Sequence, residues 1–180
     1  MKKVLILAGS PRKGGNSDLL CDEFARGAEK AGHLVEKIHV QDLKIGGCLA
    51  CYGCRGTHVC VQKDDMAAFQ EQLMASDMAV FVTPLYYFGF SAQLKTVIDR
   101  FYSINGQLTA KGLKTALLVA AWDSNDGTMR DIQAHYETLC RYLNFQNQGE
   151  VLGVGCGTVE MTKRTRFPQE AYALGKRLRG

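Results

Sequence analysis

Four cysteines lie in one short stretch of this 180-residue chain, Cys48, Cys51, Cys54 and Cys60, spaced C-x2-C-x2-C-x5-C. Three thiolates one short turn apart can reach three corners of a cube, so the run is typical of [4Fe-4S] ligation, with Cys60 free to complete the site. Zinc ribbons and fingers usually separate two cysteine pairs by about a dozen or more residues, which makes zinc the weaker interpretation. A zinc site of all four thiols, or of three thiols with His58, stays open.

A second stretch, residues 9–17, has the composition of an anion-binding loop. Its sequence GSPRKGGNS follows a short apolar run and precedes an amphipathic helical pattern. Glycines let the backbone approach an anion, and a helix N-terminus offers free N–H groups and about half a positive charge. Ser10, Asn16 and Ser17 can add hydroxyl or amide contacts, Arg12 can add a guanidinium, and Asn16 or Ser17 can cap the helix. The alternative is an ordinary glycine- and proline-rich turn.

Two familiar phosphate loops do not match this stretch. A triphosphate-binding P-loop needs Lys and Ser or Thr directly after its second glycine, whereas Gly14 is followed by Gly15 and Asn16. The dinucleotide fingerprint needs G-x-G-x-x-G at this turn, and the residues after Gly9 do not supply it. What remains is a compact site for one terminal phosphate.

Composition narrows the classes of function. With 46% hydrophobic and 22% charged residues, the chain is typical of a globular protein with one sizeable core. The net charge of +4 is mild and the basic residues are spread out, apart from residues 163–166, which we interpret as a solvated loop; we expect no nucleic-acid partner. No apolar run approaches the roughly 20 residues that cross a bilayer, and no secretion leader is visible, so we expect a cytoplasmic protein with no membrane partner. Cys21, Cys140 and Cys156 are interpreted as small core residues.

Alternating apolar runs and helical patterns predict an α/β fold. Strands are predicted where the apolar runs occur, at residues 4–8, 34–40, 79–82, 116–121 and 151–154. Helical patterns lie between them, so right-handed crossovers should produce a doubly wound, five-stranded parallel sheet in the order 2-1-3-4-5, with helices on both faces. We expect one domain over residues 1–180, with a cysteine-rich loop, residues 46–62, inserted after the second strand.

The carboxyl ends of parallel strands share one edge of such a sheet, and ligands bind where the strand order reverses. The loop after the third strand, residues 83–91, is rich in aromatics, and the loop after the fourth strand, residues 122–127, holds the only tryptophan. Residues 9–17 follow the first strand and lie at the same edge. A planar aromatic ligand with a phosphate tail would fit all three loops, with the phosphate at residues 9–17 and the ring between the other two. Packing of the aromatics under a helix is the alternative.

The residues GSPRKGGNSDLL, TPLYYFG and QLKTVIDRF resemble the flavodoxin-like NAD(P)H-dependent FMN reductases, and the resemblance extends over nearly the whole chain. It implies that Ser10, Arg12, Asn16 and Ser17 hold the phosphate of FMN. It also implies that the isoalloxazine ring is bordered on two sides by the residues Pro84, Leu85, Tyr86, Tyr87, Phe88, Gly89, Trp122 and Asp123.

The cysteine spacing is similar to that of the iron-sulfur flavoproteins, a branch of the same family in which a [4Fe-4S] cluster lies near the FMN of a neighbouring subunit. This resemblance implies that the four cysteines of residues 48–60 are the ligands of a [4Fe-4S] cluster. It also implies that the protein forms a homodimer or homotetramer. Family members without a cluster often keep several cysteines here, followed by Asp-Asp-Met as at residues 64–66. Asp64 and Asp65 are therefore interpreted as helix-start residues.

These features predict an FMN-dependent oxidoreductase in which FMN carries the chemistry and exchanges electrons with a [4Fe-4S] cluster, supplied by a ferredoxin-like donor. No side chain is required as a general acid or base. The alternative is a cluster-free reductase that passes electrons from NAD(P)H through FMN to a small quinone-type acceptor. A non-enzymatic flavodoxin-type carrier is a third hypothesis. The run Gly153 to Gly157 follows the last strand and is interpreted as a flexible loop rather than a nicotinamide site.

Overall fold

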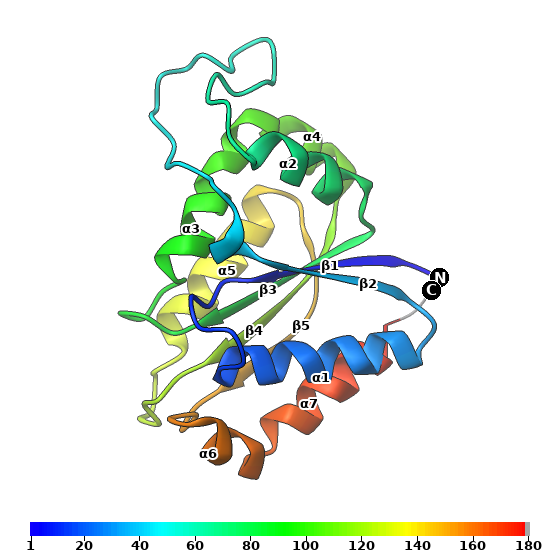
Figure 1. Cartoon of the computed structure of the whole chain (residues 1–180), viewed down its shortest axis with the longest axis vertical. Helices are drawn as coiled ribbons and strands as arrows, with labels where there is room; N and C mark the ends of the chain where they lie inside the picture. Colours follow the sequence, from blue (N-terminus) through cyan, green and yellow to red (C-terminus); the bar gives the residue numbers. More distant parts are fainter. Residues whose placement is uncertain (179–180) are drawn as a thin grey trace.

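The computed structural model describes residues 1–178 and has a five-stranded parallel sheet at its centre (Figure 1). The strand order is β2-β1-β3-β4-β5, which confirms the predicted topology. The strands are β1 (Lys3–Ala8), β2 (Leu34–His39), β3 (Met78–Pro84), β4 (Lys114–Ala120) and β5 (Gln146–Gly153).

Helices cover both faces of the sheet, as the continuous apolar strands require. One face packs against α1 (Asn16–Lys30) and α7 (Phe167–Lys176), with the short α6 (Val159–Arg164) beside them. The opposite face packs against α2 (Met66–Ala75), α3 (Ala92–Asp99), α4 (Asn105–Lys111) and α5 (Arg130–Tyr142), with 3-10 turns η1 (Val40–Asp42) and η2 (Arg100–Ile104).

The helices α1 and α7 approach each other closely because both carry a glycine at their crossing. A Cβ on Gly27 would lie 2.1 Å from the carbonyl oxygen of Tyr172, and one on Gly175 would lie 2.2 Å from that of Phe24. Such distances leave no room for any side chain. The crossing fixes the axis of α1, whose N-terminus follows residues 9–17.

Three details differ from the sequence predictions. The second strand ends at His39, and Val40 begins η1. Residues 163 and 164 belong to α6 and not to a loop. The cap of α1 is also different: Gly15 is its N-cap residue, without a side-chain cap, so neither Asn16 nor Ser17 plays that role. Among the described residues, no helix is long and apolar enough to cross a membrane.

A long segment without helix or strand, residues 43–65, connects η1 to α2 and carries the four clustered cysteines. It extends away from the sheet beyond α2 and α4 (Figure 1). The loop therefore lies outside the two helical layers.

Candidate functional site

Loops at the carboxyl edge of the sheet surround two adjoining pockets. One has a volume of about 240 Å³, the other about 310 Å³, and they share Leu85, Tyr86 and Trp122. The first is completed by Ser10, Arg12, Gly15, Asn16, Ser17, Pro84, Ala120, Cys156 and Gly157. The second is completed by Tyr87, Phe88, Ala121 and Asp123.

The structure brings together most of the residues singled out in the sequence. The four expected at a phosphate, Ser10, Arg12, Asn16 and Ser17, all line the first pocket. All the expected ring-flanking residues line one or both pockets, except Gly89. Gly89 instead closes the turn after β3, where its N–H and carbonyl pair with the backbone of Tyr86 at 3.1 and 3.3 Å.

The loop after β1 is held in shape by its own polar groups. The Ser10 hydroxyl donates to the carbonyl of Arg12 at 3.0 Å and accepts from the Arg12 N–H at 3.1 Å. The buried carboxylate of Asp18 accepts from the N–H of Gly14 at 2.7 Å. Among residues 1–178 the hydrogen bonds of Arg12 are those of its backbone, so its exposed guanidinium remains available for a ligand.

This loop is joined to the loop after β3. The buried hydroxyl of Ser91 donates to the carbonyl of Gly9 at 2.6 Å and accepts from the N–H of Leu94 at 3.3 Å, which caps α3. Gly9 has no space for a side chain, because a Cβ there would lie 2.8 Å from the Cβ of Leu94 and 2.9 Å from the carbonyl of Val82. The two loops therefore form one rigid rim.

The aromatic residues after β3 are exposed, which argues against the interpretation that they pack under a helix. Tyr86 is 49% exposed, Phe88 52% and Tyr87 101%. Tyr87 and Phe88 have φ values of 46° and 62°, a left-handed conformation that costs energy for such side chains. Strained and solvent-facing aromatics of this kind are typical of ligand-binding loops.

Asp123 organises the loop after β4. Its carboxylate accepts from the Thr128 hydroxyl at 2.6 Å and from the N–H of Ser124 at 2.9 Å, with Asn125 as a further donor. The Thr128 hydrogen bond is the main reason why the pKa of Asp123 is lowered. Asp123 thus shapes the turn that presents Trp122, which is 76% exposed.

A fourth loop, after β5, also reaches the first pocket, a role that was not predicted from the sequence. Cys156 and Gly157 line the pocket, and the Asn16 side-chain amide donates to the Cys156 carbonyl. The signal was present in the glycine-rich run Gly153 to Gly157, since it follows a parallel strand and so lies at the ligand edge.

The sequence profile described as NADPH-dependent FMN reductase matches residues 2–158. The chain belongs to this family. It is 40% identical over 112 residues to an iron-sulfur flavoprotein of Archaeoglobus fulgidus; the match covers 62% of the chain and only 50% of that relative. It is 29% identical over 136 residues to an iron-sulfur flavoprotein of Methanosarcina thermophila, covering 75% of the chain and 71% of the relative.

The fold is shared with solved flavodoxin-like reductases. An NAD(P)H:quinone oxidoreductase from Methanothermobacter marburgensis superposes with a TM-score of 0.78 at 18% identity, covering 99% of this chain and 96% of the other. This member of the reductase family therefore has the flavodoxin-like fold.

The residues of the pocket fit FMN. The guanidinium of Arg12, which has no partner within residues 1–178, lies at one end with the first N–H groups of α1, which suits a phosphate. Exposed aromatic side chains lie at the other end, which suits a planar ring. The two pockets meet at Tyr86 and Trp122, so a ligand with both parts can extend from one pocket to the other.

The cysteine-rich loop of this FMN reductase family member fits a cluster in its donor types but not in its arrangement. Cys48 and Cys51 are exposed, and Cys54 and Cys60 are half-buried. Among residues 1–178, no group of three or more His, Cys, Asp or Glu side chains is arranged so that it could hold a metal ion. The core assignment of Cys21, Cys140 and Cys156 is confirmed, since all three are buried, and burial raises the pKa of Cys21 to about 12.

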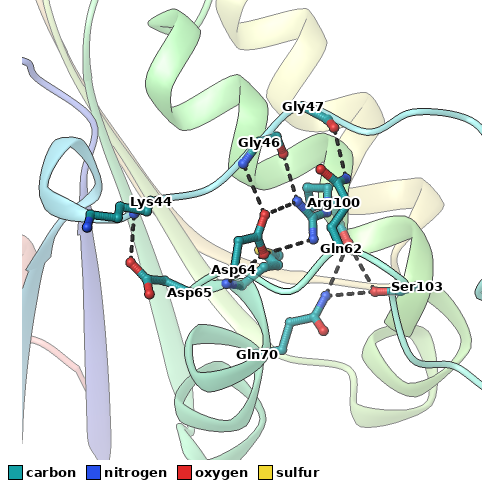
Figure 2. Close-up of polar contacts among 10 residues, drawn as sticks. Lys44, Gly46, Gly47, Gln62, Asp64, Asp65, Gln70, Arg100 and Ser103 are labelled. Atoms are coloured by element: carbon teal, nitrogen blue, oxygen red, sulfur yellow. Dashed lines mark hydrogen bonds and ion pairs between the residues drawn. The ribbon is translucent and has the colours of Figure 1, made fainter.

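Asp64 and Asp65 immediately precede α2, as expected, and Asp64 also has a partner that the sequence did not indicate. Its carboxylate accepts from the N–H of Met66 at 3.2 Å, next to the N-cap residue Asp65. It also forms a two-pronged ion pair with Arg100, at 2.7 and 3.1 Å (Figure 2). The hydrogen bonds from Arg100 are the main reason why the pKa of Asp64 is lowered.

Proposed function

We propose that the two pockets at the carboxyl edge hold FMN, with its phosphate on residues 9–17 and its ring system between residues 84–89 and 122–123. The observation that carries the proposal is the convergence of four loops on two adjoining pockets, with the exposed Arg12 at one end and exposed aromatics at the other. Arg12 and the free N–H groups of α1 would bind the phosphate, with contacts from Ser10, Asn16 and Ser17.

The chain's own residues would position the flavin and no side chain would act as an acid or base. When bound, FMN supplies hydride transfer and single-electron transfer. Tyr86 and Trp122 would flank the ring, because they border both pockets. Pro84 would fix the direction of the loop that carries Tyr86, and the hydrogen bond from Ser91 to Gly9 would keep the phosphate loop and this loop at a constant separation.

For the electron route, we propose first that Cys48, Cys51, Cys54 and Cys60 hold a [4Fe-4S] cluster, fed by a ferredoxin-like donor. The support is the thiolate spacing and the names of the two iron-sulfur flavoprotein relatives. The thiols would have to move toward one another when the cluster binds, since they are not gathered in the described structure.

The second candidate is a cluster-free route from NAD(P)H through FMN to a small quinone-type acceptor. It is favoured by the separation of the four thiols and by the NADPH-dependent reductase profile. In either case we propose a homodimer or homotetramer, which size-exclusion chromatography with light scattering would measure.

The deciding experiment is the anaerobic visible spectrum of the purified protein, with iron and sulfide counted per FMN. The cluster proposal expects about four iron and four sulfide atoms per FMN. Cys54→Ser should then lose the iron and keep the flavin, whereas Cys140→Ser, which changes a buried thiol near the Thr115 hydroxyl, should keep both. Flavin bands without iron, under conditions that preserve clusters, would leave only the second route.

A further inference from the structure

The two ends of the cysteine-rich loop are joined by a network of hydrogen bonds that we call the neck, residues 44–47 and 62–65. Lys44 and Asp65 form two of these bonds: the Lys44 N–H donates to the Asp65 carboxylate at 2.7 Å, and the Asp65 N–H donates to the Lys44 carbonyl at 3.1 Å. The Gly46 N–H donates to the Asp64 carboxylate at 3.1 Å. The Gln62 side-chain amide donates to the Gly47 carbonyl at 3.0 Å. The loop therefore leaves and re-enters the protein at one place.

Arg100 lies at the centre of the neck (Figure 2). Its Nη1 donates to the Gly46 carbonyl at 2.7 Å and to Asp64 at 2.7 Å, so one guanidinium binds both ends of the loop. The Arg100 side chain is 1% exposed. Its backbone carbonyl is held by Gln70 at 3.1 Å and by Ser103 at 3.2 Å, which fixes the base of the side chain between α2 and η2.

Arg100 also has a donor that the neck does not use. The buried Nε of Arg100 has no hydrogen-bond partner among the described residues, and such a donor is costly to leave unpaired. Arg100 and Cys60 both line a pocket of about 410 Å³, whose other walls include Met74 and Ile104.

We propose that Arg100 is a positioning residue for the cysteine-rich loop, closing its neck with one edge of the guanidinium and directing its unpaired Nε–H toward the sulfur of Cys60. Cys60 is then the anchored member of the four thiols, from which the other three extend outward. The role in redox chemistry rests on the proposed cluster, whereas the closure of the neck does not. A buried ion pair that served stability alone would not need to bind the Gly46 carbonyl as well.

The test compares Arg100→Gln with the control variant Lys95→Gln. The control removes an exposed ion pair of 2.6 Å between Lys95 and Asp99 in α3, the helix that ends immediately before Arg100. Hydrogen-deuterium exchange is measured in the FMN-loaded protein on peptides containing residues 44–47 and 57–65. Arg100→Gln should exchange about tenfold faster or more at both, and Lys95→Gln should stay within about twofold of the natural protein. Unchanged exchange in a folded Arg100→Gln protein would overturn the proposal.

A second variant separates positioning from stability. Arg100→Lys keeps a positive charge opposite Asp64 but loses the Nε–H and the fixed planar geometry of the guanidinium. We expect it to protect the neck better than Arg100→Gln while still shifting the cluster midpoint potential to more negative values, because hydrogen bonds to cluster sulfurs raise that potential. An unshifted potential in Arg100→Lys would overturn the contact with Cys60. If the natural protein holds no iron, the cluster proposal is wrong. The hydrogen-deuterium exchange measurement then tests by itself whether Arg100 closes the neck.

Discussion

The hydroxyl of Ser91 lies 2.6 Å from the carbonyl oxygen of Gly9 and donates a hydrogen bond to it, joining the start of α3 to the loop after β1. Both residues belong to loops that enclose the first pocket, and the bond is buried. We expect Ser91→Ala to cost about 2 kcal/mol of stability, because it removes this bond and the cap on Leu94. The FMN dissociation constant should rise about three- to tenfold, since the loop must then be ordered on binding.

Ser76→Ala is the control for that variant. The Ser76 hydroxyl is also largely buried and donates to a backbone carbonyl, that of Gln72, at 2.8 Å, but it lies before β3, at the opposite edge of the sheet. It should cost about 1 kcal/mol and leave FMN affinity unchanged. Urea unfolding and fluorescence titration with FMN measure the two effects. Equal FMN affinities in the two variants would contradict the role of Ser91.

Arg12 should contribute to FMN binding through its charge and geometry. Arg12→Ala is expected to weaken binding by about 1.5 to 3 kcal/mol, which is about ten- to a hundredfold in the dissociation constant. Lys13→Ala removes the same charge from the next residue, but Lys13 is already paired with Asp42 at 2.6 Å. Its effect should stay below about threefold. Similar losses in both variants would indicate a general charge effect instead of a phosphate contact.

The α1–α7 crossing predicts opposite effects for two helical glycines. Gly27→Ala should cost about 3 kcal/mol or more, because its Cβ would lie 2.1 Å from the backbone oxygen of Tyr172. Gly106→Ala, in α4, meets nothing within 4 Å and should stabilise the protein by about 0.5–1 kcal/mol. Thermal unfolding should place the two midpoints on opposite sides of that of the natural protein. A midpoint for Gly27→Ala equal to that of the natural protein would refute the crossing.

The Asp64–Arg100 pair predicts a pH-dependent contribution to stability. Hydrogen bonds from Arg100 lower the pKa of folded Asp64 below its unfolded value of about 3.9. The contribution is therefore complete above about pH 4 and is lost as the pH falls through the lower folded pKa. Asp64→Asn should be clearly less stable than the natural protein at pH 7, and the difference should shrink toward zero in acid.

Asp99→Asn provides the comparison for this pH series. Asp99 pairs with Lys95 on the surface, so its replacement should change the urea midpoint little at either pH. A stability gap for Asp64→Asn that stayed constant from pH 7 to acid would show that Asp64 acts through something other than its charge.

The fold could be predicted because its signals are local. Buried strands such as β1 and β3 are continuous apolar runs. Because these strands alternate with helices and the connections are right-handed, few strand orders are possible for the sheet. The pocket was also largely predictable, because loops that follow parallel strands must meet at one edge. Ser10, Arg12 and Tyr86 were found in this way.

Contacts between distant residues gave no such signal. The pairing of Asp64 with Arg100 joins a loop to a helix end, and neither residue lies in a periodic pattern that would link them. Cys156 was interpreted as a small core residue and is buried, but its carbonyl also accepts a hydrogen bond from Asn16 at the pocket, which the sequence did not indicate. Asn16 or Ser17 was expected to cap α1, but the helix has no side-chain cap, and the Asp18 carboxylate instead accepts a hydrogen bond from the N–H of Gly14 in the preceding loop. This contact depends on the folded shape of the loop, so the sequence alone did not indicate it.

An anaerobic titration of the FMN-loaded protein with NADPH, and in parallel with NADH, followed by flavin absorbance, measures directly whether the bound flavin accepts electrons from a nicotinamide cofactor. We expect the protein to retain FMN through gel filtration, and we expect a nicotinamide cofactor, or a reduced ferredoxin where iron is present, to bleach the flavin band in proportion to the electrons added. A protein that retains no FMN would contradict the site. A flavin that dithionite bleaches but none of these donors reduces would contradict the oxidoreductase and leave an electron carrier.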